Sequence, residues 1–160
     1  MKHYINLFKS FFYAFRGILS TVNTERNMRI HLTCMIYMFS FLLLTDWWEL
    51  SKGEWCAILL ACALVISGEI VNTAIENVVD MVTKDYNEYA KRAKDAGSGA
   101  VLVSAIVAVA VGLITLYQPE AFSSMFGYFK ENPVSLVLFI LSIIPATLFI
   151  FFGIPIGKKK

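Results

Sequence analysis

A stripe of polar side chains crosses an otherwise apolar stretch of the chain. Glu69, Asn72, Glu76 and Asp80 follow one another at spacings of three, four and four residues. At about 100° per residue of α-helix, these side chains share one face. A carboxylate inside a membrane helix costs several kcal/mol and is by default a functional site. Where the stripe meets the membrane surface, its carboxylates beside a lysine can hold Mg²⁺ and phosphate oxygens.

The stripe also has two other interpretations, a polar seam that fixes helix packing and an ion pathway in a small transporter. Residues 69 to 76 cover roughly 10 Å of helix, and Asp80 lies about one turn further on. The stripe therefore links the membrane interior to the inner surface. A pathway would need an outward route, yet beyond Glu69 toward Trp55 the chain offers only Ser67 and Gly68 before apolar residues.

Composition indicates a membrane protein, because 58% of the residues are hydrophobic and the mean hydropathy is +0.64. A net charge of +2 is too small to imply a nucleic-acid partner. The three cysteines show no metal-ligand spacing and are interpreted as small core hydrophobes. One small helical membrane domain is the expectation.

The apolar pattern predicts an all-α fold with an interfacial helix followed by a transmembrane bundle. Hydrophobic residues recur at helical spacing over residues 4–20, which is typical of an amphipathic helix lying in the membrane interface. Transmembrane spans are predicted at about 30–48, 55–82, 98–117 and 134–156. The charged stretch 83–97 is expected to be a loop, and 119–133 a polar link.

Basic residues predict the orientation of these spans. Of the 14 Lys and Arg residues, only Lys52 and Lys130 fall in loops that lie outside when both termini are inside. The positive-inside rule favours this arrangement. We therefore expect a multi-pass protein of the cytoplasmic (inner) membrane, with the N-terminus, the 83–97 loop and the C-terminus all cytoplasmic.

Two segments of the chain resemble the signature of a known family. EIVNTAIENVVDMV, at 69–82, and AKRAKDAGSGAVL, at 90–102, are similar to motifs of the prokaryotic diacylglycerol kinase and undecaprenol kinase family of small integral-membrane lipid kinases. The resemblance covers roughly residues 11–117 and includes FRGILSTVNTERNMRIH before the first span. It implies a lipid kinase domain at 1–118, and a C-terminal extension at 119–160 that adds a fourth span to the three of the family.

What the resemblance implies about activity is transfer of the γ-phosphate of MgATP to the hydroxyl of a membrane lipid. The enzyme would be a homotrimer with active sites shared between subunits. The runs NMRIH and ALVISGEIVNTAIE look more like the undecaprenol kinase branch, so undecaprenol is the favoured substrate and undecaprenyl phosphate the product. Diacylglycerol, giving phosphatidic acid, is the alternative, and a non-enzymatic ion or solute transporter is the alternative of another class.

The resemblance also implies roles for individual residues. Glu69 would be the general base beside the lipid hydroxyl, with Asn72 next to it, and Ser98 would contact the lipid with Glu69. Metal ligands would be Glu25 and Glu76. The residues implied at the nucleotide are Tyr13, Arg16, Glu25, Glu76, Tyr86, Asn87, Lys94 and Asp95.

Three of the residues near the first span also have plainer interpretations. Tyr13 and Arg16 match positions that face the nucleotide in the family, but an aromatic and a cation on an interfacial helix often serve only as membrane anchors. His31 is interpreted as an interfacial residue at the start of the first span.

Overall fold

The computed structural model describes residues 2–153, and side chains from Leu7 to Gly153. This part of the chain contains only helices, as the sequence predicts. Their bounds are α1 Lys2–Thr24, α2 Arg26–Leu44, α3 Lys52–Val82, α4 Glu88–Leu116, α5 Pro119–Glu131 and α6 Pro133–Phe152. Among them α2, α3, α4 and α6 are long and apolar enough to cross a membrane. The all-α membrane fold with four spans is confirmed.

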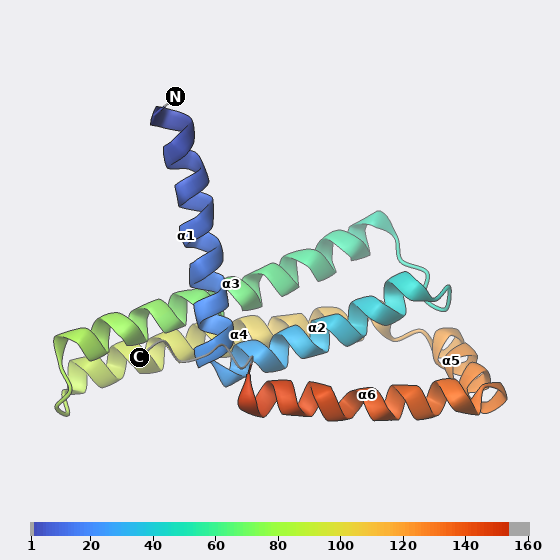
Figure 1. The fold of residues 1–160 in the computed structure, drawn as a ribbon. Coiled ribbons are helices and arrows are strands. Elements are labelled where there is room, and N and C mark those ends of the chain that lie inside the picture. The colour runs from blue at the N-terminus through green and yellow to red at the C-terminus, as the bar shows by residue number, and fades with distance from the viewer. Residues whose placement is uncertain (1, 154–160) are drawn as a thin grey trace.

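The spanning helices run side by side, and α1 projects away from them (Figure 1). The helix pair with the most extensive contact is α3 and α4, an antiparallel hairpin that carries the polar stripe. Its α3 arm begins at a capping box, in which Ser51 Oγ accepts from the Glu54 amide while the Glu54 carboxylate accepts from the Ser51 amide. Apart from a few buried positions, most large apolar side chains of the described residues are exposed on the surface, as expected where lipid is the solvent.

Several boundaries differ from the expected ones. The first span, expected at about 30–48, is α2 Arg26–Leu44, and the interfacial helix, expected at 4–20, runs on to Thr24. At two further places, local helix signals extend or create helices in polar sequence. The 83–97 loop shrinks to residues 83–87, since Asn87 Oδ1 accepts from the amides of Tyr89 and Ala90 and starts α4 at Glu88. The expected polar link at 119–133 is instead largely the helix α5, which starts with Pro119 in its first turn. The end of the predicted fourth span, residues 154–156, lies outside the described residues.

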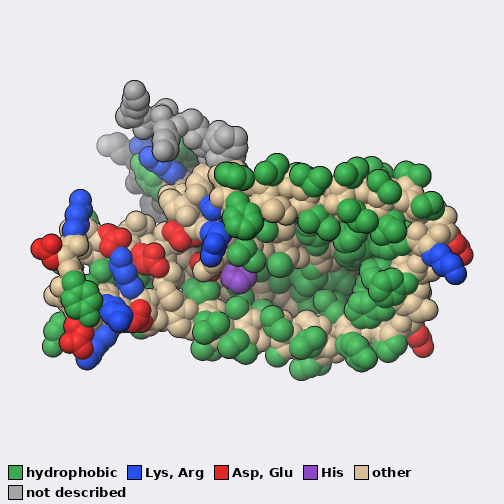
Figure 2. Space-filling view, turned by 90° about the horizontal axis from the view of Figure 1, so that it is seen from below, with side chains coloured by type: hydrophobic (Ala, Val, Ile, Leu, Met, Phe, Trp, Pro, Cys, Tyr) green, Lys and Arg blue, Asp and Glu red, His purple; other side chains and the backbone are tan. Residues whose placement is uncertain are grey.

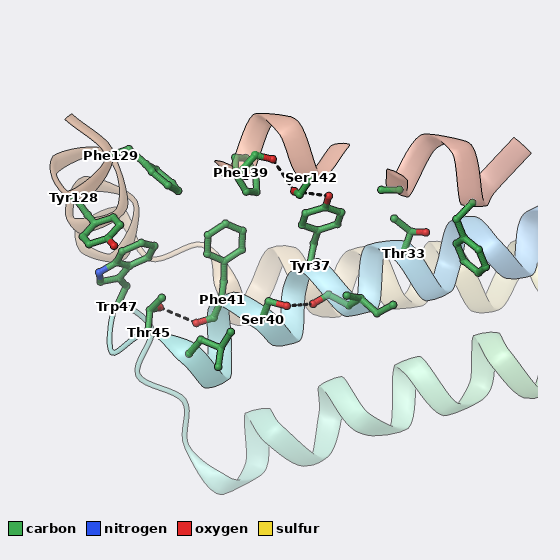
Figure 3. Close-up of a pocket in the computed structure, with 14 residues that line it drawn as sticks. Thr33, Tyr37, Ser40, Phe41, Thr45, Trp47, Tyr128, Phe129, Phe139 and Ser142 are labelled. Atoms are coloured by element: carbon green, nitrogen blue, oxygen red, sulfur yellow. Dashed lines mark hydrogen bonds between the residues drawn. The ribbon is translucent and has the colours of Figure 1, made fainter. Parts of the chain in front are cut away.

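The extension formed by α5 and α6 packs against α2. In the middle of this contact Tyr37 and Ser142 share a hydrogen bond of 2.8 Å between their hydroxyls (Figure 3). Phe139 packs edge-on against the rings of both Tyr37 and Phe41. A largely apolar cavity of about 540 Å³ remains between α2, α5 and α6. It shares no lining residue with the cavity at the polar stripe, so the fourth span lies beside the hairpin site rather than over it.

Candidate active site

A cavity of about 260 Å³ lies between α2, α3 and α4, at the membrane-interior end of the polar stripe. α3 contributes Glu69 and Asn72, and α4 contributes Ser98. The polar lining from α2 is Asn27 and His31. Three predicted site residues, Glu69, Asn72 and Ser98, therefore line one cavity. The first two share a face of α3 because of their helical spacing, and the close packing of α4 on α3 brings the third beside them.

Glu69 is almost completely buried, with 2% of its surface exposed. Its Oε1 atom has no hydrogen-bond partner among the described residues. The nearest basic atom is His31 Nε2, 3.4 Å away, which is longer than an ordinary N–H···O hydrogen bond. A buried carboxylate oxygen without a donor is costly unless a ligand supplies one. The atom is thus available to accept a hydrogen bond from a hydroxyl group.

Asn72 is held between the stripe and α4. Its Nδ2 donates a 2.8 Å hydrogen bond to Glu76 Oε1, one turn along α3. On the other side, a Cβ atom built on Gly97 would lie only 2.5 Å from Asn72 Oδ1. Since a real Cβ cannot approach an oxygen so closely, a side chain at position 97 would displace Asn72 or separate α4 from α3, and glycine lets the two helices pass closely here. Asn72 thereby joins Glu76, the cavity and the α3–α4 contact.

Glu25 and Glu76 lie near Glu69 and form an acidic group with it. Glu25 is the residue between α1 and α2, at the N-cap of α2, but its side chain bonds to no amide of the first turn. Glu76 uses one oxygen for the Asn72 amide. No three His, Cys, Asp or Glu side chains of residues 7–153 are grouped closely enough to hold a metal ion by themselves.

A second cavity, of about 430 Å³, lies at the turn between α3 and α4 and is lined by residues from the end of α3, the turn and the start of α4. Charged side chains gather at this end of the molecule (Figure 2). Lys94 pairs with Asp80, the last residue of the stripe. The side chains implied at the nucleotide that line this cavity are Tyr86, Asn87, Lys94 and Asp95. Asn87 also has a structural function, because its Oδ1 caps α4.

Tyr13 and Arg16 are not brought to either cavity. Both are exposed on α1, and neither lines the Glu69 cavity or the α3–α4 cavity. Tyr13 makes an edge-on ring contact with Phe12 on the same helix. Their exposed positions in the single chain agree with the interpretation of both side chains as membrane anchors.

His31 and Asn27 are cavity residues that the sequence pattern does not identify. From the sequence His31 is an interfacial residue, whereas in the structure its ring lies against Glu69. The available signal is the spacing of Asn27 and His31, four residues apart and therefore on one face of α2. That spacing becomes informative only once α2 is known to pack its polar face on α3.

An apolar cavity of about 350 Å³ adjoins the Glu69 cavity, since His31 and Ala105 line both. It lies between the same three helices and is lined mainly by aliphatic and sulfur-containing side chains, including Met35, Met38 and Val65. The buried carboxylate thus has an apolar space beside it and a charged, exposed cavity at the end of the hairpin.

Comparisons with known proteins agree with this chemistry. The family model for prokaryotic diacylglycerol kinase matches residues 12–116. An undecaprenol kinase from Bacillus subtilis is 43% identical over 115 residues, which are 71% of this chain and 89% of that protein. A diacylglycerol kinase from Synechocystis is 40% identical over 115 residues, again 71% of this chain but 64% of that protein. A diacylglycerol kinase from Escherichia coli is 51% identical over 55 residues, 34% of this chain and 45% of that protein.

The family match covers the interfacial helix from Phe12, the first three spans and the polar stripe, and it stops before α5 and α6. It favours an enzyme over a transporter for the chain as a whole. The chain belongs to the prokaryotic diacylglycerol kinase family and is an ATP-dependent membrane lipid kinase.

Proposed function

We propose that this enzyme transfers the γ-phosphate of ATP to the hydroxyl of undecaprenol, giving undecaprenyl phosphate, with Glu69 as the general base. The observation that carries the proposal is the buried Glu69 Oε1, which has no donor among the described residues and faces a cavity reached through apolar surroundings. A lipid hydroxyl is a donor of the right kind at the right depth.

In this reaction Glu69 accepts the proton of the lipid hydroxyl while the hydroxyl oxygen bonds to the γ-phosphorus. The bond from that phosphorus to the β–γ bridging oxygen breaks, and ADP leaves. Such transfers depend mainly on alignment of the two oxygens and on compensation of phosphoryl charge. Asn72 donates from its amide to the carboxylate of Glu76, which holds that carboxylate in a fixed position on the stripe. Ser98, on the α4 side of the cavity, is placed to contact the lipid headgroup.

Glu25 and Glu76 would hold Mg²⁺ together with phosphate oxygens of ATP. The donor set fits, because Mg²⁺ in kinases is usually held by one or two carboxylates plus phosphates and waters. Glu25 makes no hydrogen bond or ion pair through its carboxylate among the described residues, and Glu76 has an oxygen beyond the one bonded to Asn72. When bound, the metal supplies neutralisation of charge on the transferred group.

The α3–α4 cavity is the proposed nucleotide site. Lys94 provides the cation for the phosphates, while Asp95, Tyr86 and Asn87 contact the rest of the nucleotide. The Lys94–Asp80 pair is exposed to solvent, so its cost of separation is small and the ammonium group can turn to a phosphate. Tyr13 and Arg16 of α1 would join the nucleotide only from another subunit, or they serve as anchors.

Undecaprenol is preferred over diacylglycerol on two grounds. The undecaprenol kinase from Bacillus subtilis is 43% identical over 115 residues, compared with 40% over 115 residues for the Synechocystis diacylglycerol kinase. The apolar cavity beside Glu69 also extends between α2, α3 and α4, which suits a hydroxyl at the end of one long chain. Diacylglycerol, with phosphatidic acid as product, is the second candidate, favoured by the E. coli relative that is 51% identical over the matched segment.

We further propose a homotrimer in the cytoplasmic membrane, with the N-terminal helix, the α3–α4 turn and the C-terminus on the cytoplasmic side. ATP is on that side, and so is most of the positive charge of the chain. Shared active sites are supported by the exposure of Tyr86 and Asp95, which leaves room for a neighbouring subunit to close the nucleotide cavity.

The test is transfer of labelled γ-phosphate from MgATP to undecaprenol and to diacylglycerol in mixed micelles, with the native chain, Glu69→Gln and Glu76→Gln. We expect labelled undecaprenyl phosphate from the native enzyme. Glu69→Gln should lose at least about 100-fold, the scale of a lost acid–base group, and Glu76→Gln should lose about as much because it removes a proposed ligand of the metal that neutralises phosphoryl charge. The matched control is Glu49→Gln, an exposed carboxylate between α2 and α3, which should keep native activity.

The outcomes separate the parts of the proposal. Preference for diacylglycerol would replace the substrate and keep the mechanism. Native-like rates in Glu69→Gln would remove Glu69 as the base. Loss of activity in Glu49→Gln as well would mean that the variants report on folding rather than on chemistry.

A further inference from the structure

Arg29, in the first turn of α2, joins three helices at one point. The residue is 6% exposed, and its guanidinium donates to backbone carbonyls. Nη1 bonds to the Val22 carbonyl at 3.0 Å and the Asn23 carbonyl at 2.9 Å, both at the end of α1. Nε bonds to the Ile150 carbonyl at 2.9 Å, in the last turn of α6. Residues 121 positions apart in the sequence are thereby tied together.

Helix ends explain why one arginine can do this. The last carbonyls of an α-helix have no intrahelical donor, and the C-terminus carries partial negative charge. Arg29 meets these needs for α1 and α6 at once. No carboxylate pairs with it among residues 7–153. A buried cation held by carbonyls alone is sensitive to the loss of any of them.

Gly153 closes the α6 side of this junction. It has a φ of +69°, a conformation that side-chain-bearing residues rarely adopt. A Cβ at position 153 would lie 3.5 Å from Arg29 Nη1 and 3.7 Å from the Asn23 carbonyl oxygen. Glycine thus lets the end of α6 turn away directly beside the guanidinium.

Glu25 lies in the short segment of chain that the Arg29 hydrogen bonds hold in place. This residue separates α1 from α2, so the Arg29 bonds to Val22 and Asn23 fix the bend at which Glu25 sits. The family match ends at residue 116, so α6 is an addition to the shared kinase core. We propose that α6 is a positioning element of the kinase: by binding and covering Arg29, its end fixes the α1–α2 bend and holds Glu25 where it can bind Mg²⁺. The inference rests on the metal role given to Glu25 in the proposed function.

The test compares full-length native enzyme, Arg29→Lys and Gly153→Val in micelles by two readouts. One is the Mg²⁺ dependence of the rate. The other is direct binding of Mn²⁺ together with a non-hydrolysable ATP analogue, followed by the electron paramagnetic resonance signal of free Mn²⁺, and we expect this affinity to fall in both variants. Lysine keeps the charge but cannot make the fork of bonds to three carbonyls, and valine at a positive φ displaces the end of α6. We expect the Mg²⁺ concentration for half-maximal rate to rise about 3- to 10-fold in both, with an unchanged KM for the lipid. Ser142→Ala, which removes the Tyr37 bond in the middle of α6, is the control and should leave the Mg²⁺ dependence native.

Non-additivity provides the second measurement. Arg29→Lys combined with Gly153→Val should have the Mg²⁺ dependence of the stronger single variant, because both act on one junction. Native Mg²⁺ dependence in Gly153→Val overturns the inference, even if Arg29→Lys fails to fold. An equal shift in Ser142→Ala also overturns it, since general loosening of α6 would then suffice. In both cases the native enzyme still phosphorylates its lipid; if the native enzyme does not, it is the proposed function that fails.

Discussion

His31 and Glu69 come from different helices and meet in the cavity without a regular hydrogen bond, at 3.4 Å between Nε2 and Oε1. A hydroxyl bound in the cavity beside the two atoms could contact both, accepting from His31 Nε2 and donating to Glu69 Oε1. In the proposed reaction His31 therefore orients the lipid hydroxyl toward the base. Geometry of this kind commonly tightens when the substrate binds.

Replacing His31 with Gln tests this placement. We expect kcat to fall about 10-fold, which corresponds to about 1.4 kcal/mol of transition-state stabilisation, with little change in the KM for MgATP. The lipid kinase assay with varied ATP measures both. Ser40→Ala, further along α2 and away from the cavity, is the control. A native kcat in His31→Gln would leave Glu69 acting without this neighbour.

The residues of the stripe could be predicted from sequence because they belong to one helix, where spacing alone fixes the shared face. Glu69, Asn72 and Glu76 do lie together, as their spacing indicates. His31 could not be assigned in this way, because its position depends on how α2 packs against α3. Nor could Arg29 be recognised as a junction residue, since its Ile150 partner is 121 residues away. The catalytic roles carried over from the family stay predictions.

At the scale of elements, the α3–α4 hairpin depends on close approach at Gly97. Asn72 Oδ1 occupies the space where a side chain at position 97 would begin. Asn72 cannot turn aside freely, because its amide is bonded to Glu76 and it is buried. The hairpin contact and the order of the acidic group are thus coupled.

Gly97→Ala should lower both stability and activity. The new methyl group must displace Asn72 or separate the helices, at a cost of about 1–3 kcal/mol, and displacement of Asn72 releases Glu76. Gly99→Ala is the matched control on the same helix, with nothing within 4 Å of the new Cβ, and should be neutral or slightly stabilising. Thermal unfolding in detergent and the kinase assay would compare the two variants. Equal behaviour of the pair would contradict the close contact.

Helix boundaries show where sequence patterns are sufficient and where they are obscured. Apolar length predicts α3 and the start of α6 to within three residues, whereas the predicted first span is displaced by four residues from α2. The start of α4 is hidden by charge, although Asn87 followed by Glu88 is a regular helix beginning. α5 is missed for a similar reason, even though it has Pro119 and Glu120 in its first turn and Lys130 in its last. Polar composition alone therefore does not distinguish a loop from an exposed helix.

At the scale of the whole molecule, the four apolar helices alternate in direction, so the chain has two distinct ends. The α3–α4 turn lies at one end, and α5 and the α2–α3 connection lie at the other (Figure 1). The Arg29–Ile150 bond places the end of α6 with the α1–α2 junction. The described chain thus returns to the side from which its first span started.

Cysteine labelling would test this topology in a background where Cys34, Cys56 and Cys62 are replaced by Ala. We expect Lys130→Cys to react with a membrane-impermeant thiol reagent in cells whose cytoplasmic membrane is intact but whose outer layers have been made permeable to the reagent. Asp85→Cys should react only after lysis, because it lies in the α3–α4 turn at the opposite end. The contrast in labelling between the two variants is the measurement. Reaction of both from the same side would contradict the four-span arrangement.

Glu69 lies below the membrane surface and beside an apolar cavity, and this position determines which measure of lipid concentration the rate of the enzyme depends on. A substrate that arrives by lateral diffusion is never at a bulk concentration that the protein can sense. The relevant variable is its mole fraction among the other lipids, a two-dimensional density, while ATP is sampled in three dimensions from the water. The same carboxylate therefore lies at the boundary between two solvents, and dilution of the membrane with inert lipid acts on the enzyme like dilution of a soluble substrate with water.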